Sequence, residues 1–283
     1  MRQRLPPVQP IRALLPDDLV QAHGLTQAVR WPHRVEDWRF ALDMGDGFAV
    51  SDGERLLGTA MGWAFGPARG CFGMLIVAPD QQGQGLGARL MGAALDRLGG
   101  RAVQLHATPD GQKLYRRLGF EATSAIRQHQ GAVGRVAAAP VPAGMRLRPA
   151  VATDLAAISA LDEAATGMAR GRVLAALLAA GDTAVLDRDG LVGGFAILRP
   201  FGRGEVLGPV VAPDLPAAWA LVTHMLARRE GAFVRIDITD FALSPLLEAQ
   251  GLACVDEALR MVRGGSSEAA AVRSYALVNQ ALG

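Results

Sequence analysis

A chain of 283 residues is long enough to form one large domain or two of ordinary size. Hydrophobic residues make up 50% of it and charged residues 20%, which supplies enough apolar surface for complete cores and excludes a globally disordered chain. The formal net charge is +2, and Lys and Arg are scattered along the sequence, so composition indicates neither a nucleic-acid nor a membrane partner.

The cysteine and hydropathy patterns exclude further classes of protein. Cys71 and Cys254 lie far apart, without a CxxC pair or a histidine cluster, so we expect no metal site and no disulfide framework. The first ten residues lack the apolar run of a signal peptide, and no stretch approaches the roughly 20 apolar residues of a membrane span. We therefore expect a cytoplasmic protein.

The first half of the chain predicts an α+β protein whose strands run in mixed directions. Helices are expected over residues 17–44, and strands at 47–51, 55–63 and 72–77. A helix to Leu98, a strand at 103–106 and a short helix follow. The helix to Leu98 packs one face on a sheet, because apolar residues recur at intervals of four: Leu86, Leu90, Ala94 and Leu98.

A glycine-rich segment, Gln82-Gly83-Gln84-Gly85-Leu86-Gly87-Ala88-Arg89, joins the third strand to that helix. Three glycines in five residues let the backbone approach a ligand closely, and the first amides of a helix have no partner within it. A phosphate placed there meets the positive end of the helix dipole, worth up to ~1 kcal/mol at an exposed site. Gln82 and Arg89 add side-chain donors. The segment predicts an anion site rather than a flexible surface turn.

Two other phosphate-binding motifs fit less well. Gly83-x-Gly85-x-x-Ala88 matches the dinucleotide pattern G-x-G-x-x-A, but residues 79–82 separate it from the strand. The next strand also ends without the acidic residue that binds ribose, so we reject nicotinamide cofactors. The P-loop pattern G-x-x-x-x-G-K-[ST] is absent.

The second half repeats the landmarks of the first half in the same order. Besides the sequence VAPD at 77–80 and 211–214, three pairs agree: Ile11-Arg12 with Leu147-Arg148, Leu57-Gly58 with Val192-Gly193, and Leu118-Gly119-Phe120 with Gln250-Gly251-Leu252. Chance explains one short match, but a collinear series favours duplication. We expect two related domains, residues 1–138 (the first copy) and 139–283 (the second copy).

The second copy keeps the elements and loses the glycine segment. Strands are expected at 183–186, 191–198 and 234–238, where Arg235 and Asp237 alternate with apolar residues as in a half-buried strand, and a last strand at 275–278. Alignment on VAPD places Pro216, Ala217, Trp219 and Leu221 opposite Gln82, Gly83, Gly85 and Gly87. Pro216 removes an amide, and Trp219 and Leu221, most simply core or interface residues, would fill the space of a phosphate, so the second copy predicts no anion site.

Two motifs of the first copy resemble the GNAT superfamily of N-acetyltransferases. Gln82-x-x-Gly85-x-Gly87 satisfies its hallmark [QR]-x-x-G-x-[GA] between a strand and a helix, and Leu114-Tyr115 precedes Gly119-Phe120 in the expected order. The resemblance covers residues 10–130 most closely, and the whole chain looks like tandem GNAT proteins with a degenerate C-terminal copy. It implies two α+β domains, each with a mixed, mostly antiparallel sheet flanked by helices.

The resemblance also implies a cofactor and site residues. Acetyl-CoA is the implied co-substrate, with its pyrophosphate on the amides of Gln82, Gly83, Gln84, Gly85, Leu86, Gly87, Ala88 and Arg89, and its pantetheine along Leu75, Ile76 and Val77. Tyr115 would protonate the departing thiolate, although an ordinary buried tyrosine is the alternative.

The implied reaction is direct transfer of an acetyl group to a primary amine, more often of a small metabolite than of a protein. The segment with Trp31 and His33 would form one wall of the acceptor site. The candidates for the base are His33, Glu36, Asp37 and His106. For each of them a structural role is expected more often than a catalytic one. The alternative function is a non-catalytic acyl-CoA-binding or regulatory module.

Overall fold

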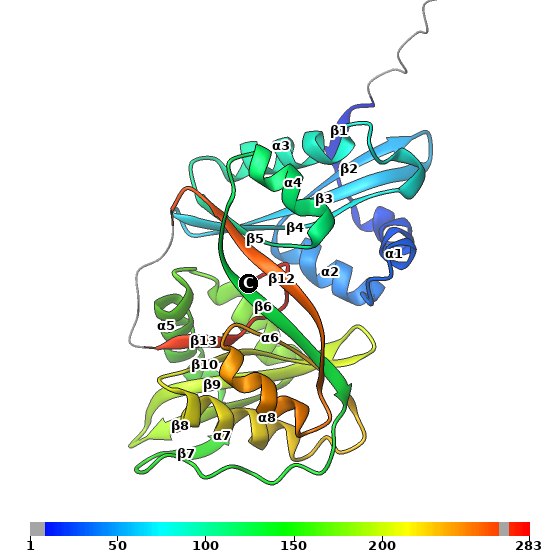
Figure 1. The fold of residues 1–283 in the computed structure, drawn as a ribbon. Coiled ribbons are helices and arrows are strands. Elements are labelled where there is room, and N and C mark those ends of the chain that lie inside the picture. The colour runs from blue at the N-terminus through cyan, green and yellow to red at the C-terminus, as the bar shows by residue number, and fades with distance from the viewer. Residues whose placement is uncertain (1–8, 266–271) are drawn as a thin grey trace, which may run out of the picture. The chain divides into compact units, whose positions relative to one another are not determined.

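The computed structural model describes residues 9–265 and 272–283, and its elements follow the order expected of two copies (Figure 1). The α+β class with a mixed, mostly antiparallel sheet is confirmed. The first copy contains β1 (Ile11–Ala13), α1 (Leu19–Ala28), α2 (Val35–Met44), β2 (Asp46–Asp52), β3 (Arg55–Phe65), β4 (Arg69–Val77), α3 (Leu86–Leu98), β5 (Ala102–Ala107), α4 (Pro109–Arg117) and β6 (Glu121–Ala132).

The second copy repeats this series and adds a strand at its end. It contains β7 (Arg146–Pro149), α5 (Leu155–Thr166), α6 (Gly171–Ala180), β8 (Asp182–Arg188), β9 (Leu191–Phe201), β10 (Gly204–Ala212), α7 (Leu215–Leu226), β11 (Phe233–Ile238), α8 (Ser244–Glu248), β12 (Ala253–Arg263) and β13 (Arg273–Ala276). Within the described ranges, no helix combines the length and hydropathy that crossing a bilayer requires.

The chain forms two compact units that do not follow the boundary between the copies. The first unit holds the residues up to Trp63 and Phe72–Gly99, and the second holds Ala64–Cys71 and everything from Gly100 onward. The strands and helix β5, α4 and β6 of the first copy therefore lie in the same unit as the whole second copy.

In the first unit, glycines on β3 set the distance between helix and sheet. A Cβ placed on Gly58 would lie 3.1 Å from Leu90, and one on Gly62 would lie 3.4 Å from Leu98. Residues four apart on a strand share a face, so α3 lies directly against this face of β3. Trp63 points to the opposite face, where its indole N–H donates to the Ala41 carbonyl of α2 at 2.9 Å. The expected amphipathic helix is confirmed by its buried face.

In the second unit, the copies exchange equivalent strands. The strand order is β5-β12-β6-β11-β13-β10-β9-β8-β7. The first copy's β5 pairs antiparallel with β12 of the second copy, while the first copy's β6 pairs with both β12 and β11 of the second. Figure 1 shows β6 and β12 as long strands side by side. Neither copy completes its sheet with its own strands alone.

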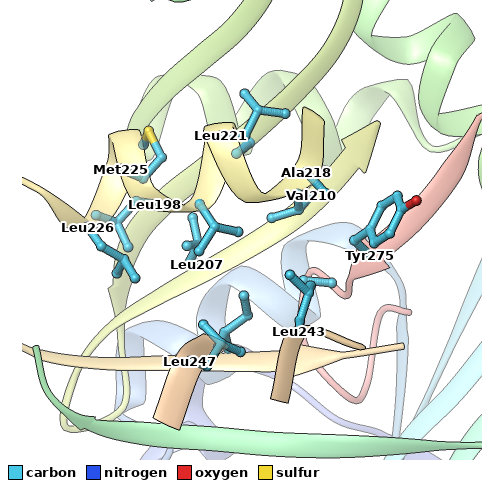
Figure 2. Close-up of a cluster of buried hydrophobic side chains, with 14 of the residues drawn as sticks. Leu198, Leu207, Val210, Ala218, Leu221, Met225, Leu226, Leu243, Leu247 and Tyr275 are labelled. Atoms are coloured by element: carbon cyan, nitrogen blue, oxygen red, sulfur yellow. The ribbon is translucent and has the colours of Figure 1, made fainter. Parts of the chain in front are cut away.

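The core of the second copy lies between α7, α8 and the sheet (Figure 2). Leu221, Met225 and Leu226 of α7 contribute to it, together with Leu247 of α8. Trp219 packs against the same cluster. The interpretation of Trp219 and Leu221 as core residues is confirmed, whereas the expectation that they fill the space of a phosphate was wrong, because both pack in the core of the second copy.

The central strand β11 is buried on both faces, contrary to the expected half-buried strand. Asp237 is 0% exposed and Arg235 is 7% exposed. The reason is that residues distant in the sequence cover the second face: the Phe201 ring lies 5.7 Å from the Arg235 guanidinium, and the Gln280 amide donates to Asp237 at 3.4 Å. The two charges are paired, with the Arg235 guanidinium 2.9 Å from the Asp237 carboxylate, as burial of a charge requires.

The exchange brings Gly131 of β6 against the turn that precedes β12. A Cβ on Gly131 would lie 2.2 Å from the Gly251 carbonyl oxygen, which a backbone shift must relieve. We expect Gly131→Ala to lower the free energy of unfolding by about 1–3 kcal/mol, measured by thermal and urea denaturation. Gly92→Ala in α3 is the control, because a Cβ there meets nothing within 4 Å, and it should stabilise by roughly 0.5–1 kcal/mol. Equal stability of the two variants would contradict this account of the junction.

Candidate functional site

The loop before α3 depends on two glycines with left-handed backbone. Gly83 has a φ of +77° and Gly85 a φ of +82°, conformations that strain any other residue. A Cβ at either position would meet nothing within 4 Å, so the space in front of the loop is open. Conformation, rather than crowding by neighbours, accounts for the two glycines.

The N-terminus of α3 is left without a cap. Gly85 is the N-cap residue, no side chain accepts from the first amides, and the first turn has no acidic residue. The first amide with a partner in the helix is that of Arg89, which donates to the Gly85 carbonyl at 3.2 Å. The amides of Leu86, Gly87 and Ala88 therefore precede the helical hydrogen bonds and point out at the positive end of the dipole. This arrangement suits an anion such as a pyrophosphate.

The two side chains expected to supply further donors are engaged with backbone. Gln82 is exposed, and its amide donates to the Val77 carbonyl at 3.1 Å. Arg89 donates to the Gln9 carbonyl. Gln84 donates to the Gln81 side chain at 3.4 Å. In this conformation the donors directed at an anion are the backbone amides.

The edge of β4 contains a strained residue that sequence reasoning missed. Met74 has a φ of +52°, although it is neither glycine nor asparagine, and it is 4% exposed. Its carbonyl accepts from the Thr59 hydroxyl at 3.0 Å, so β3 holds it in place. The strain lies immediately before Leu75, Ile76 and Val77, the expected pantetheine edge. Backbone strain of this kind concentrates at functional sites, and no residue type in the sequence announces it.

Trp31 and His33 lie between α1 and α2 in the same unit as the loop. Their rings are 5.8 Å apart and tilted by 44°. Asp37, a candidate base, caps α2 instead: it accepts from the Arg34 amide at 2.9 Å and pairs with the Arg34 guanidinium at 2.8 Å. The Asp37 carboxylate therefore has a structural role at the start of α2. Glu36 is exposed on the first turn of α2.

Tyr115 lies in the second unit, near the end of α4. Its side chain is 9% exposed, and burial raises the pKa of its phenol to about 12. The ring lies over the first turn of its own helix, because a Cβ on Gly111 would come within 2.6 Å of it. Phe120 contacts the ring with a centroid distance of 6.2 Å. The phenol keeps its proton at neutral pH, as an acid or hydrogen-bond donor must.

His106 on β5 is a neutral histidine of defined tautomer. Its Nδ1 lies 2.7 Å from the Gln280 carbonyl oxygen, which only accepts, so Nδ1 carries the proton. Burial is the main cause that lowers its pKa, to about 4. Its Nε2 is buried, and no hydrogen-bond partner exists for it in the described part of the chain. A buried acceptor without a partner is rare in folded proteins.

The same helix terminus in the second copy is closed by its own carboxylate. Asp214 is the N-cap of α7 and accepts from the Ala217 amide at 2.8 Å. Its counterpart Asp80 instead pairs with Arg55 at 2.6 Å, which lowers the Asp80 pKa to about 2. The difference arises because α7 begins directly after Asp214, while five residues, 81–85, separate Asp80 from α3.

The strand edge that corresponds to Leu75–Val77 is also occupied in the second copy. The parallel strands β10 and β11 pair at Glu205 and Val206 with Val234 and Arg235. Beyond that point β13 lies between them, with Val210 opposite Ala276 and Ala212 opposite Arg273. The edge of β10 that would receive an extended ligand is therefore bonded to the chain's own β13.

Comparisons with known proteins agree with the two copies. Profiles of the acetyltransferase (GNAT) domain match residues 45–122 and again residues 158–275. The uncharacterized N-acetyltransferase YitH of Bacillus subtilis (strain 168) is 27% identical over 216 residues, which cover 75% of this chain and 76% of that protein.

Solved structures share the fold over nearly the whole chain. A putative acetyltransferase from Pyrococcus horikoshii superposes with a TM-score of 0.79 at 18% identity, covering 100% of this chain and 99% of that one. A tandem GNAT protein from the clavulanic acid biosynthesis pathway gives 0.64 at 16% identity, covering 92% and 100%. With both domain matches and this fold, the chain carries two GNAT acetyltransferase domains in tandem and is an acyltransferase of that family.

Proposed function

We propose that the first copy transfers an acetyl group from acetyl-CoA directly to a primary amine of a small metabolite. The observation that supports it most is the uncapped N-terminus of α3 behind two left-handed glycines. The alternative, a non-catalytic acyl-CoA-binding module, needs the same loop but gives the protonated phenol of Tyr115 no role.

The residues of the first copy fit the group they would hold. The amides of Leu86, Gly87 and Ala88 would donate to the pyrophosphate, and the edge at Leu75, Ile76 and Val77 would hold the pantetheine. Acetyl-CoA would supply an activated thioester. A backbone amide at this edge would stabilise the developing oxyanion, and a single such donor is worth ~3–4 kcal/mol.

Tyr115 is proposed to hold the proton that the sulfur receives. With a pKa of about 12, its phenol stays protonated through neutral pH. A thiolate of ordinary pKa ~8.5 is a weaker base than the phenolate, so the phenol would stabilise the departing thiolate chiefly by a hydrogen bond, and any proton it gives to sulfur would be replaced by the one that the attacking amine loses. Trp31 and His33 are proposed to line the acceptor site.

The cofactor proposal is tested at Gly85. Gly85→Asp forces an aspartate into left-handed backbone and places a carboxylate where the pyrophosphate would lie. We expect acetyl-CoA at 100 times its Kd to stabilise the wild type by ~2.7 kcal/mol and to leave the variant's Tm unchanged. Gly190→Asp is the control, because Gly190 also has a positive φ, +87°, and open space around it. If acetyl-CoA still raises the Tm of Gly85→Asp, the loop is not part of the cofactor site.

The acid is tested by Tyr115→Phe, which keeps the ring and removes the hydroxyl. We expect unchanged acetyl-CoA affinity and a kcat about 10–10⁴-fold lower, measured by release of free CoA from a panel of amines. Because burial raises the pKa of Tyr115 to about 12, its proton is present below that pH, so kcat of the wild type should show no loss assignable to Tyr115 below pH 10. Equal kcat values for the wild type and Tyr115→Phe would mean that Tyr115 has only a packing role.

The number of sites is tested by calorimetry on the intact chain. We expect one acetyl-CoA per chain, because Asp214 neutralises the terminus of α7 and β13 occupies the edge of β10. Gly85→Asp should bind none, whereas Asp214→Ala should still bind one, since β13 remains in place. A stoichiometry near two for the wild type would mean that both copies hold cofactor.

A further inference from the structure

A cavity of about 600 Å³ lies in the second copy, where β7 and β8 meet the end of α6 and the C-terminal turn of α7. Its volume is within the range of small-molecule sites, roughly 300–1,000 Å³. Much of its wall is formed by residues with the smallest side chains: Ala150, Ala152, Ala175, Ala179, Gly181 and Ala184.

The first copy fills the corresponding space. Leu14 follows β1 and its amide donates to the Gly47 carbonyl at 2.9 Å, as the Ala150 amide after β7 donates to Thr183 at 2.9 Å. Leu14 thus corresponds to Ala150, and Gly47 to Thr183. A Cβ on Gly47 would lie 2.8 Å from Leu14 and 2.9 Å from Leu42, so these leucines close the space. Replacement of Leu14 by Ala150 leaves it open in the second copy.

The change at Gly47 adds a polar group to the wall of the cavity. The Thr183 hydroxyl oxygen is buried, and it has no hydrogen-bond partner among the residues described. A buried hydroxyl without a partner costs about 1–3 kcal/mol. A ligand atom that reaches it when χ1 turns toward the cavity recovers that cost.

One cation at the mouth of the cavity is available to a ligand. Arg229 is engaged by Glu205 at 2.8 Å and by Asp182. Arg228 is exposed and lines the cavity, and the described part of the chain offers its guanidinium no acidic partner. Its charge acts locally: burial first, and then Arg228, lowers the pKa of the neighbouring His224.

We propose that this cavity binds a small amphipathic carboxylate, with the apolar part on the alanine wall and the carboxylate beside Arg228 and Thr183. The wall excludes a strongly hydrated ligand, because most of its surface is aliphatic. The mouth favours an anion, because the residues that the structure describes give Arg228 no acidic partner. The site is separate from the loop before α3 and does not depend on acyl transfer.

The test is calorimetric titration of the full chain with decanoate. We expect saturable binding below about 1 mM, and Arg228→Gln should weaken it about two- to fivefold, as for an exposed ion pair. The double variant Ala150→Leu/Thr183→Gly recreates the residues of the first copy, so it should fold and bind at least tenfold more weakly. Arg203→Gln, an exposed arginine away from the cavity, is the control and should bind as the wild type.

Two results would overturn the proposal. If decanoate binds the double variant as tightly as the wild type, the ligand occupies another site. If decanol binds as tightly as decanoate, or Arg228→Gln has no effect, the preference for a carboxylate is wrong. Thermal melts of every variant without ligand separate lost binding from lost folding, because the double variant should melt within a few degrees of the wild type.

Discussion

The exchange of strands between the copies is the constraint on which the rest of the structure depends. The hydrogen-bonding groups of β5 are completed by β12, and those of β6 by β11 and β12, so strands from both copies alternate in this part of the sheet. Unpaired strand edges are costly when buried, and the pairing removes them. The exchange also places Tyr115 and His106 of the first copy in the same compact unit as the whole second copy. Two candidate catalytic residues therefore lie in the unit that lacks the glycine-rich loop.

The two copies show how one helix terminus gains or loses an anion site. In both, Asp follows Val-Ala-Pro at the end of a strand. Five additional residues move the helix away from Asp80, which pairs with Arg55, and expose the amides of α3. Without those residues, Asp214 satisfies the amides of α7 itself. A carboxylate from the chain and a phosphate from a ligand can each accept hydrogen bonds from the first amides of a helix, so a terminus that has one does not need the other.

Local patterns in the sequence predicted much of the fold and part of the candidate site. The period of α3 and the glycine-rich loop before it follow from near neighbours along the chain, and the correspondence of the copies follows from comparing the two halves of the sequence. The buried Arg235–Asp237 pair, the insertion of β13 and the exchange of strands depend on contacts between distant residues, which periodicity does not encode. The positive φ of Met74 could not be predicted from the sequence for another reason, because the sheet imposes it and the residue type does not.

The ribosome synthesises the exchanged strands of the first copy before their partners in the second copy. Strand β6 emerges about 130 residues before the end of β12, its antiparallel partner. At 5–20 residues per second, the nascent first copy waits roughly 7–26 s with its partner strand unmade. During that interval β5 and β6 lack the strand that pairs with both of them, so their edges stay unpaired in the nascent chain.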